Sequence, residues 1–494
     1  MHTAVAVNKI NSIQILLEYG ANLESKNING DTPLHVAASK GDNDVLRLLL
    51  SNKININSQN NVNNTPMHTA VAVNKINSIQ ILLEYGANLE SKNINGDTPL
   101  HVAASKGDND FSSYLKLKNL NGDSPLHIEV ALGRVEVIQK LLSSKINVNT
   151  QNNVNNTPMH IAAVAGKINS IQILLENGAN VESKNINGDS PLHVAASIGQ
   201  NDVLRLIRCQ FGIKNINGDT PLHVAASKGH NDVLRLLLSN KININSQNNV
   251  NNTPMHTAVA FKKINSIRIL LEYGVNLESK NINGDTPLHV AASVGQIEVL
   301  RLLLPNIINI NSQNNVNNTP MHTAVAVNKI NSIQTLLEYG ANLESKNING
   351  DTPLHVAASK GHNDVLRLLL SNKININSQN NVNNTPMHTA VAVNKINSIQ
   401  ILLKYGANLE SKNINGDTPL HVAASKGHND VLRLLLSNKI NINSQNNVNN
   451  TPMHTAVAVN KINSIQILLE YGANLESKNI NGDTPLHVAA SKEQ

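Results

Sequence analysis

Histidine is the residue type in this chain with the widest chemistry, because its side chain binds metals and moves protons near neutral pH. The 494-residue sequence holds 19 histidines. Sixteen occupy the fourth place of a recurring tetrapeptide, as His2 and His35 do, and the others are His230, His362 and His428. Copies in successive repeats would lie about 8–10 Å apart, too far for two ligands of one metal. We therefore predict a structural role for these histidines and no metal site.

The other reactive side chains show no catalytic arrangement. The single cysteine, Cys209, has no partner tied to it by a recognisable motif. No glycine-rich phosphate loop, CxxC or HExxH motif occurs. The carboxylates recur with the repeat, as Asp364 and Glu410 do, whereas a catalytic acid–base pair would occur once. We therefore expect a non-enzymatic protein with no catalytic residue and no cofactor.

The recurring tetrapeptide, Thr/Ser-Pro-Leu/Met-His, sets the organisation of the chain. Twelve of the fourteen intervals between its copies are 33 residues long, and the other two are 26 and 30. A fixed period of this size indicates a stacked array. Leucine and methionine forms, here called Leu-type and Met-type repeats, alternate. Residues 352–417 and 418–483 are therefore near-identical double repeats, which differ only at Lys404 and Glu470.

Each repeat predicts two short helices. In the Leu-type repeat that follows residue 31, Thr32 is the expected N-cap and Pro33 the first helical residue. His35 stands where the glutamate of a capping box would return a hydrogen bond to the cap. Gly41 is expected to end this helix, and the apolar segment 44–52 predicts the second. Helices this short become stable only when neighbouring repeats bury their apolar faces.

A turn joins successive repeats. The turn before a Leu-type repeat contains an Asn-Gly pair, as at Asn29-Gly30, which predicts a tight hairpin because both residues tolerate a positive φ. The Met-type counterpart, SQNNVNN, has asparagine alone at these places. We therefore expect a looser turn before the Met-type repeats. Those repeats also carry an asparagine, Asn74, where the helix-ending glycine stands in the Leu type.

The segments NGDTPLHVAASKGHNDVLRLLLSN and ILLEYGANLES resemble the ankyrin repeat over essentially the whole chain. The resemblance rests on the TPLH box, the paired alanines, the leucine triplet and the Gly-Ala pair, all at a period of 33 residues. It implies an all-α fold, a right-handed solenoid of stacked helix-turn-helix repeats with β-hairpin fingers. It also implies a scaffold that binds other proteins on the fingers and the concave face.

Two repeats are short, at residues 98–123 and 190–219. They predict three blocks: residues 1–123, 124–219 and 220–494. Each junction also carries a polar residue at a core position. Glu129 replaces an alanine, where an unpaired buried carboxylate would be costly, and Arg208 replaces a leucine. We predict that the array opens first around residues 107–135, which native-state hydrogen exchange would test.

The composition limits the partners. The net charge of +6 is spread over the whole chain with both signs interspersed, so no nucleic-acid-binding patch is expected. No apolar run approaches about 18 residues, which excludes a membrane span. A single cysteine suits a reducing compartment. We therefore expect a monomeric, cytoplasmic protein with protein partners.

The candidate partner-binding residues stand at two places in the repeat and form a regular lattice. We expect charged and apolar side chains to alternate along it and to bind an extended partner over several repeats. Phe261 replaces a valine and is a candidate anchor. The candidates before the tetrapeptide are Asp285, Asp351, Asn384, Asp417 and Asn450, and those at the end of the first helix are Val294, Lys360, Val393, Lys426 and Val459.

Two other functions fit the sequence. The array would serve as a structural spacer or elastic rod if its length were its function. Alternatively, it would be the repeat portion of a larger protein, since Met1 falls inside a Met-type tetrapeptide and residues 491–494 stop after one helix of the last repeat. Changing the exposed side chains would abolish partner binding but would leave a spacer function intact, which distinguishes the two.

Overall fold

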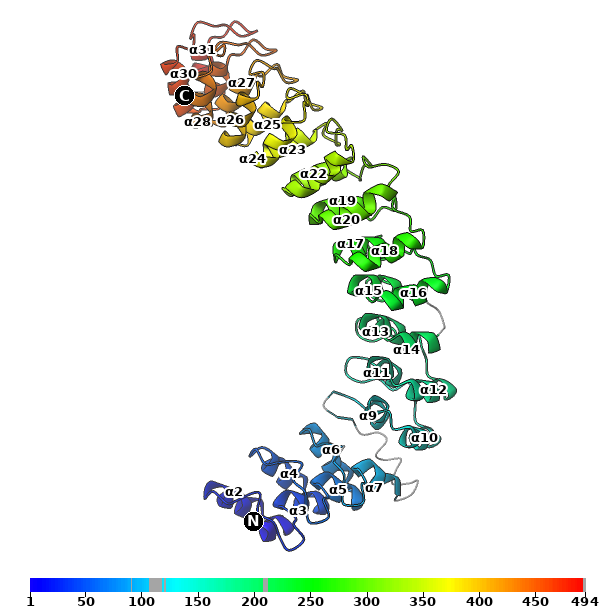
Figure 1. Ribbon diagram of the computed structural model, residues 1–494. Helices are drawn as coiled ribbons and strands as arrows, with labels where there is room; N and C mark the ends of the chain where they lie inside the picture. Colours follow the sequence, from blue (N-terminus) through cyan, green and yellow to red (C-terminus); the bar gives the residue numbers. More distant parts are fainter. Residues whose placement is uncertain (90, 106–117, 120, 208–211, 492–494) are drawn as a thin grey trace. The chain divides into compact units, whose positions relative to one another are not determined.

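A computed structural model describes residues 1–494 except 90, 106–117, 120, 208–211 and 492–494. The chain forms two compact units: residues 1–225 with 232–242, and residues 226–231 with 243–494. Within each unit, the first helices of successive repeats pack against one another, as α3 does on α5, and the second helices do the same (Figure 1). Each unit is therefore an all-α repeat solenoid.

In most of the repeats that the structure describes, the helices follow one another in pairs. In the first half of the chain they are α1 (His2–Ala6), α2 (Ile10–Glu18), α3 (Pro33–Lys40), α4 (Asn43–Leu50), α5 (Pro66–Ala72), α6 (Ile76–Glu84), α7 (Pro99–Ser105), α9 (Pro125–Leu132), α10 (Val135–Ser143), α11 (Pro158–Ala165), α12 (Ile168–Glu176), α13 (Pro191–Ile198), α14 (Asn201–Leu206), α15 (Pro221–Lys228) and α16 (Asn231–Ser239).

The same alternation continues to the end of the described chain. These helices are α17 (Pro254–Ala260), α18 (Ile264–Glu272), α19 (Pro287–Val294), α20 (Ile297–Leu303) with the short η1 (Leu304–Asn306), α21 (Pro320–Ala326), α22 (Ile330–Glu338), α23 (Pro353–Lys360), α24 (Asn363–Leu370), α25 (Pro386–Ala392), α26 (Ile396–Lys404), α27 (Pro419–Lys426), α28 (Asn429–Leu436), α29 (Pro452–Ala458), α30 (Ile462–Glu470) and α31 (Pro485–Ser491).

The first helix of each repeat begins as predicted. In α23, Thr352 is the N-cap and Pro353 the first helical residue, and the Thr352 and His355 side chains form a reciprocal capping box. The helix ends at Gly361, whose φ is 78°. The apolar residues of this helix and the next are buried to build a core of leucine, valine, isoleucine and alanine. The predicted capping role of the motif histidine is confirmed.

The predicted β-hairpin fingers are absent, since no strand occurs among the residues that the structure describes. The finger, defined here as residues 27–31 and their equivalents, is a turn held by an asparagine side chain. Asn27 N donates to Asp31 O at 3.0 Å. The reciprocal donor, Asp31 N, instead donates to Asn27 Oδ1 at 3.0 Å. Because this side chain takes the place of a main-chain partner, no ladder forms between the two arms.

The Met-type finger is as tight as the Leu-type finger, so the prediction of a looser turn was wrong. The Gly30 N to Asn27 O distance is 2.9 Å, and the equivalent distance from Asn63 N to Asn60 O is also 2.9 Å. Asn63 supplies the positive φ, at 59°, that Gly30 supplies at 77°. The neighbouring Asn29 keeps a negative φ. One residue in the left-handed region is therefore enough, and asparagine tolerates that region.

The first short repeat leads into a buried charge. Glu129 in α9 is 1% exposed, but Arg134 lies 3.6 Å from its carboxylate, so the predicted unpaired carboxylate has a partner. Apolar side chains that include Met67, Leu100 and Ile128 line a cavity of about 30 Å³ beside it. Arg208 and Cys209 lie outside the described residues, as does the whole segment 107–117. The three-block division and the early opening of residues 107–135 stay predictions.

Candidate protein-interaction surface

The motif histidine joins each first helix to the next finger. His355 Nδ1 accepts a hydrogen bond from Thr352 N at 3.2 Å, so the ring proton is on Nε2. His355 Nε2 then donates to the main-chain oxygen of Asn384, in the following finger, at 2.9 Å. The same pair of bonds recurs at His388, which reaches Asp417 O at 3.0 Å. Each neutral histidine therefore caps its own helix and fixes the position of the next finger.

Burial makes these histidines hard to protonate. Loss of solvation lowers the pKa of His388 to about 4, against its ordinary value of 6.5, and outweighs the opposing effect of the hydrogen bond to Asp417. Burial likewise lowers the pKa of His355 and His421. The neutral form that the capping box requires is therefore the form present at neutral pH.

Main-chain hydrogen bonds between neighbouring fingertips form a second series of contacts within each unit. Ile414 N donates to Val382 O at 2.9 Å, and Ile480 N donates to Val448 O at 2.9 Å. In both of these bonds a Leu-type finger donates to the Met-type finger before it. A Met-type finger donates to the Leu-type finger before it from the same position, as Asn381 N does to Asn349 O at 3.0 Å. One main-chain hydrogen bond therefore links each of these fingertips to the next, and the stack holds the tips at a regular spacing.

The predicted binding residues of the finger are engaged between repeats. Asn380 Nδ2 donates to Asp351 Oδ1 at 2.8 Å, and Asp285 and Asp417 each accept an equivalent bond at 2.7 Å. Asn384 and Asn450 are half-buried, and their main-chain oxygens accept from motif histidines at 2.9 Å. The three aspartate side chains and the main-chain oxygens of the two asparagines therefore hold neighbouring repeats together, whereas Asn384 Oδ1 and Asn450 Oδ1 are buried without a hydrogen-bond partner in the described chain. A role for these five residues in partner binding stays a prediction.

The predicted residues at the end of the first helix are mostly in solvent. Lys360 and Lys426 are exposed, and Val393 and Val459 are each 47% exposed. These residues occupy one register, eight residues after the N-cap threonine, and we call the line that they form the helix-end row. Phe261, at 60% exposed, and half-buried Val294 belong to the same row. The row therefore presents separate apolar side chains to solvent on well-packed helices.

Sequence reasoning missed a second apolar row at the fingertips. Ile348, Val382 and Ile414 are 56%, 46% and 56% exposed, and Val448 and Ile480 continue the series. The recurring isoleucine and valine of the fingers were visible in the sequence. Their exposure to solvent could not be predicted, because the geometry of the turn decides which way the second and third residues of the finger point. The Leu-type finger exposes the first of them, and the Met-type finger the second.

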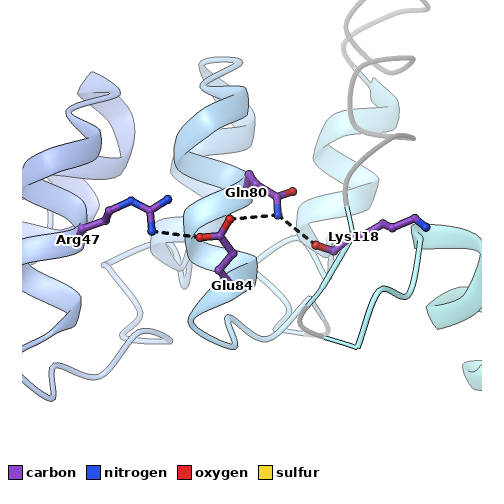
Figure 2. A network of polar contacts seen from close by, with 4 residues as sticks. All are labelled: Arg47, Gln80, Glu84 and Lys118. Atoms are coloured by element: carbon purple, nitrogen blue, oxygen red, sulfur yellow. Dashed lines mark hydrogen bonds and ion pairs between the residues drawn. The ribbon is translucent and has the colours of Figure 1, made fainter. Parts of the chain in front are cut away.

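The second helices carry a polar surface of a different kind. Arg47 on α4 donates to Glu84 on α6 at 3.1 Å, and Gln80 Nε2 lies 3.4 Å from both Glu84 and the main-chain oxygen of Lys118 (Figure 2). The same ion pair recurs between Arg433 and Glu470 at 2.8 Å. These ion pairs join the second helices of neighbouring repeats.

Metal binding and membrane insertion find no support in the described part of the chain. No group of three or more histidine, cysteine, aspartate or glutamate side chains there is placed to hold a metal ion. Of the helices that the structure describes, none has the length and apolar character needed to cross a bilayer. The exposed side chains of the two apolar rows are the feature that remains to be explained.

Short helix pairs, stacked through capping histidines and presenting exposed side chains, define a helical repeat protein. A family model described as "Ankyrin repeats (3 copies)" matches residues 1–93, 88–152, 145–214, 192–281, 275–347, 342–413, 394–479 and 443–494. The chain belongs to the ankyrin repeat family along its whole length. Ankyrin repeats are generally protein-interaction modules and are typically non-enzymatic. No curated protein matches the chain.

Proposed function

We propose that this chain is a protein-binding scaffold, whose partners contact the fingertip row and the helix-end row. The observation that carries the proposal is the exposure of one aliphatic side chain at each described fingertip from Ile348 to Ile480. Exposed apolar side chains that gather on neighbouring elements mark protein-interaction sites. A spacer would need the stacking contacts but not these side chains.

The chain supplies its own matched substitutions for a test. Asn381 stands in a Met-type finger at the place where Ile348 stands in the Leu-type finger, so Ile348→Asn and Ile414→Asn put a side chain that this turn already accepts in place of isoleucine. A control variant carries Gln400→Ala and Gln466→Ala, which are exposed on the second helices.

The experiment is a pull-down from cell extract with the full chain, the fingertip variant and the control variant. We expect proteins that the unchanged chain and the control retain to be lost from the fingertip variant, while its thermal unfolding stays the same. Equal retention of partners by all three chains would refute the fingertip row as the contact surface, and retention by none would refute the scaffold function.

A further inference from the structure

Two stretches of the helix-end row run through three repeats without lysine: Leu132, Ala165 and Ile198, and then Phe261, Val294 and Val327. Only the second includes an aromatic side chain, and Phe261 is also the most exposed of these apolar residues. In the row from Lys360 to Val459, lysines separate the valines. Upstream, Val294 replaces the lysine of its Leu-type repeat, so Phe261, Val294 and Val327 follow one another in three successive repeats without a charge between them. Their helices α17, α19 and α21 pack in order. We call these three residues the apolar triplet.

Two residues at this place depart from the regular Met-type repeat. Phe261 and Lys262 stand where neighbouring Met-type repeats have valine and asparagine, as at Val327 and Asn328. Lys262 adopts a φ of 60°, a conformation that disfavours lysine more than asparagine. Stacking does not call for these changes, because the regular repeats pack without them. Their effect is on the exposed surface.

Lysines surround the apolar triplet. Lys228 and Lys360 occupy the same row on either side of it, and Lys262 follows Phe261; all three are exposed. The stems of Lys263 and Lys329 lie across Gly229 and Gly295, within about 3 Å of where a Cβ would stand, and so bring two more ammonium groups to the row.

The opposing charges do not cancel these lysines. Helices α17, α19 and α21 contain no acidic residue, and in this unit the first turns of the second helices α18, α20, α22 and α24 contribute only Glu298 and Asp364, two carboxylates against five lysines. None of these charged groups forms an ion pair within the part of the chain that the structure describes. The site is apolar at its centre and positive around it.

We infer that the apolar triplet binds a segment of a partner protein that has apolar side chains at its centre and aspartate or glutamate at both ends. Because repeats stack about 10 Å apart, an extended segment would place an apolar side chain on each repeat at intervals of about three residues. The lysines match the acidic ends and disfavour a basic segment or a second copy of this face. The inference rests on the proposed scaffold function and names the partner chemistry at one site.

The repeat again supplies matched variants. Val294→Lys restores the residue that the same helix has at Lys360 and Lys426, so the fold already accepts it. Val459→Lys makes the same change in a stretch where lysine already interrupts the row. Lys360→Val does the reverse and extends the apolar triplet to Val393.

The experiment pans a phage library of random peptides, each about sixteen residues long, against the full-length chain and these variants. Peptides selected by the unchanged chain should carry apolar residues between acidic ends. They should bind Val294→Lys about tenfold more weakly, Val459→Lys equally well and Lys360→Val more tightly. Raised salt should weaken binding, because the flanking contacts are ionic.

Two outcomes overturn the inference: peptides without acidic ends, or equal binding by the unchanged chain and Val294→Lys. The pull-down separates this failure from that of the scaffold function. If the fingertip variant loses its partners while panning gives either outcome, the scaffold function stands and the apolar triplet is not the site.

Discussion

Acid should unfold this array, because each repeat depends on a neutral histidine. The pKa of His388 is about 4 in the folded chain and 6.5 when unfolded, so the unfolded chain binds protons first as the pH falls. The contribution of neutral His388 to the free energy of unfolding is therefore full above pH 6.5 and is lost as the pH falls from 6.5 to about 4. At pH 5 the loss is about 2 kcal/mol for this one histidine.

Neighbouring repeats add to the effect. Burial also lowers the pKa of His355 and His421, so the loss recurs from repeat to repeat. A folded domain is stable by only about 5–15 kcal/mol, and we therefore expect the helical circular dichroism signal to collapse cooperatively between pH 6 and pH 4. In urea titrations, His388→Gln should reduce the slope of the free energy of unfolding against pH by up to about 1.4 kcal/mol per pH unit, because one titrating group is removed. Glutamine also completes a capping box, so the helix start is kept. A helix signal that stays constant from pH 7 to pH 4 would refute the reasoning.

Two further predictions concern stability. Ser398 donates to Asn363 at 3.0 Å, whereas the equivalent Ser332 faces a repeat with isoleucine in place of that asparagine and its buried hydroxyl has no partner in the described chain. Ser398→Ala should therefore cost about 1 kcal/mol and Ser332→Ala nothing, and equal costs in urea titrations would contradict this. Lys373 has a φ of 53°, so Lys373→Gly should raise the free energy of unfolding in urea titrations by about 0.5–1 kcal/mol, whereas Asn394→Gly, at a φ of 55°, should raise it less because asparagine tolerates this region. An unchanged or lowered free energy of unfolding for Lys373→Gly would contradict the strain.

Local signals predicted the helices well, because caps act within a few residues. Thr352, Pro353 and His355 stand next to one another in the sequence, and the structure confirms the helix start that they predict. The fingers were harder to predict. The Asn-Gly pair indicates a turn, but whether the arms pair as strands depends on the asparagine two residues earlier, whose side chain takes the main-chain partner.

The surface could be predicted only in part. Val393 and Lys360 were identified by their register, and both are exposed. Asp351 was expected to be available to a partner, yet it accepts a bond from Asn380 in the next repeat. That contact joins residues 29 positions apart, so it follows from how repeats stack. Glu129 and Arg134 show the same limit, because their pairing depends on the fold around a shortened repeat.

The alternation of two kinds of interface has a consequence for how such a gene changes length. Ser398 bonds to Asn363 and Ser464 to Asn429, each a Met-type residue reaching the preceding Leu-type repeat, 66 residues apart. Unequal crossing-over that adds or removes 66 residues restores every such pair. A shift of any other length, as at residues 98–123 and 190–219, joins repeats whose surfaces were not matched. The heritable unit of growth is therefore the double repeat, and copying it lengthens the array without duplicating the apolar triplet.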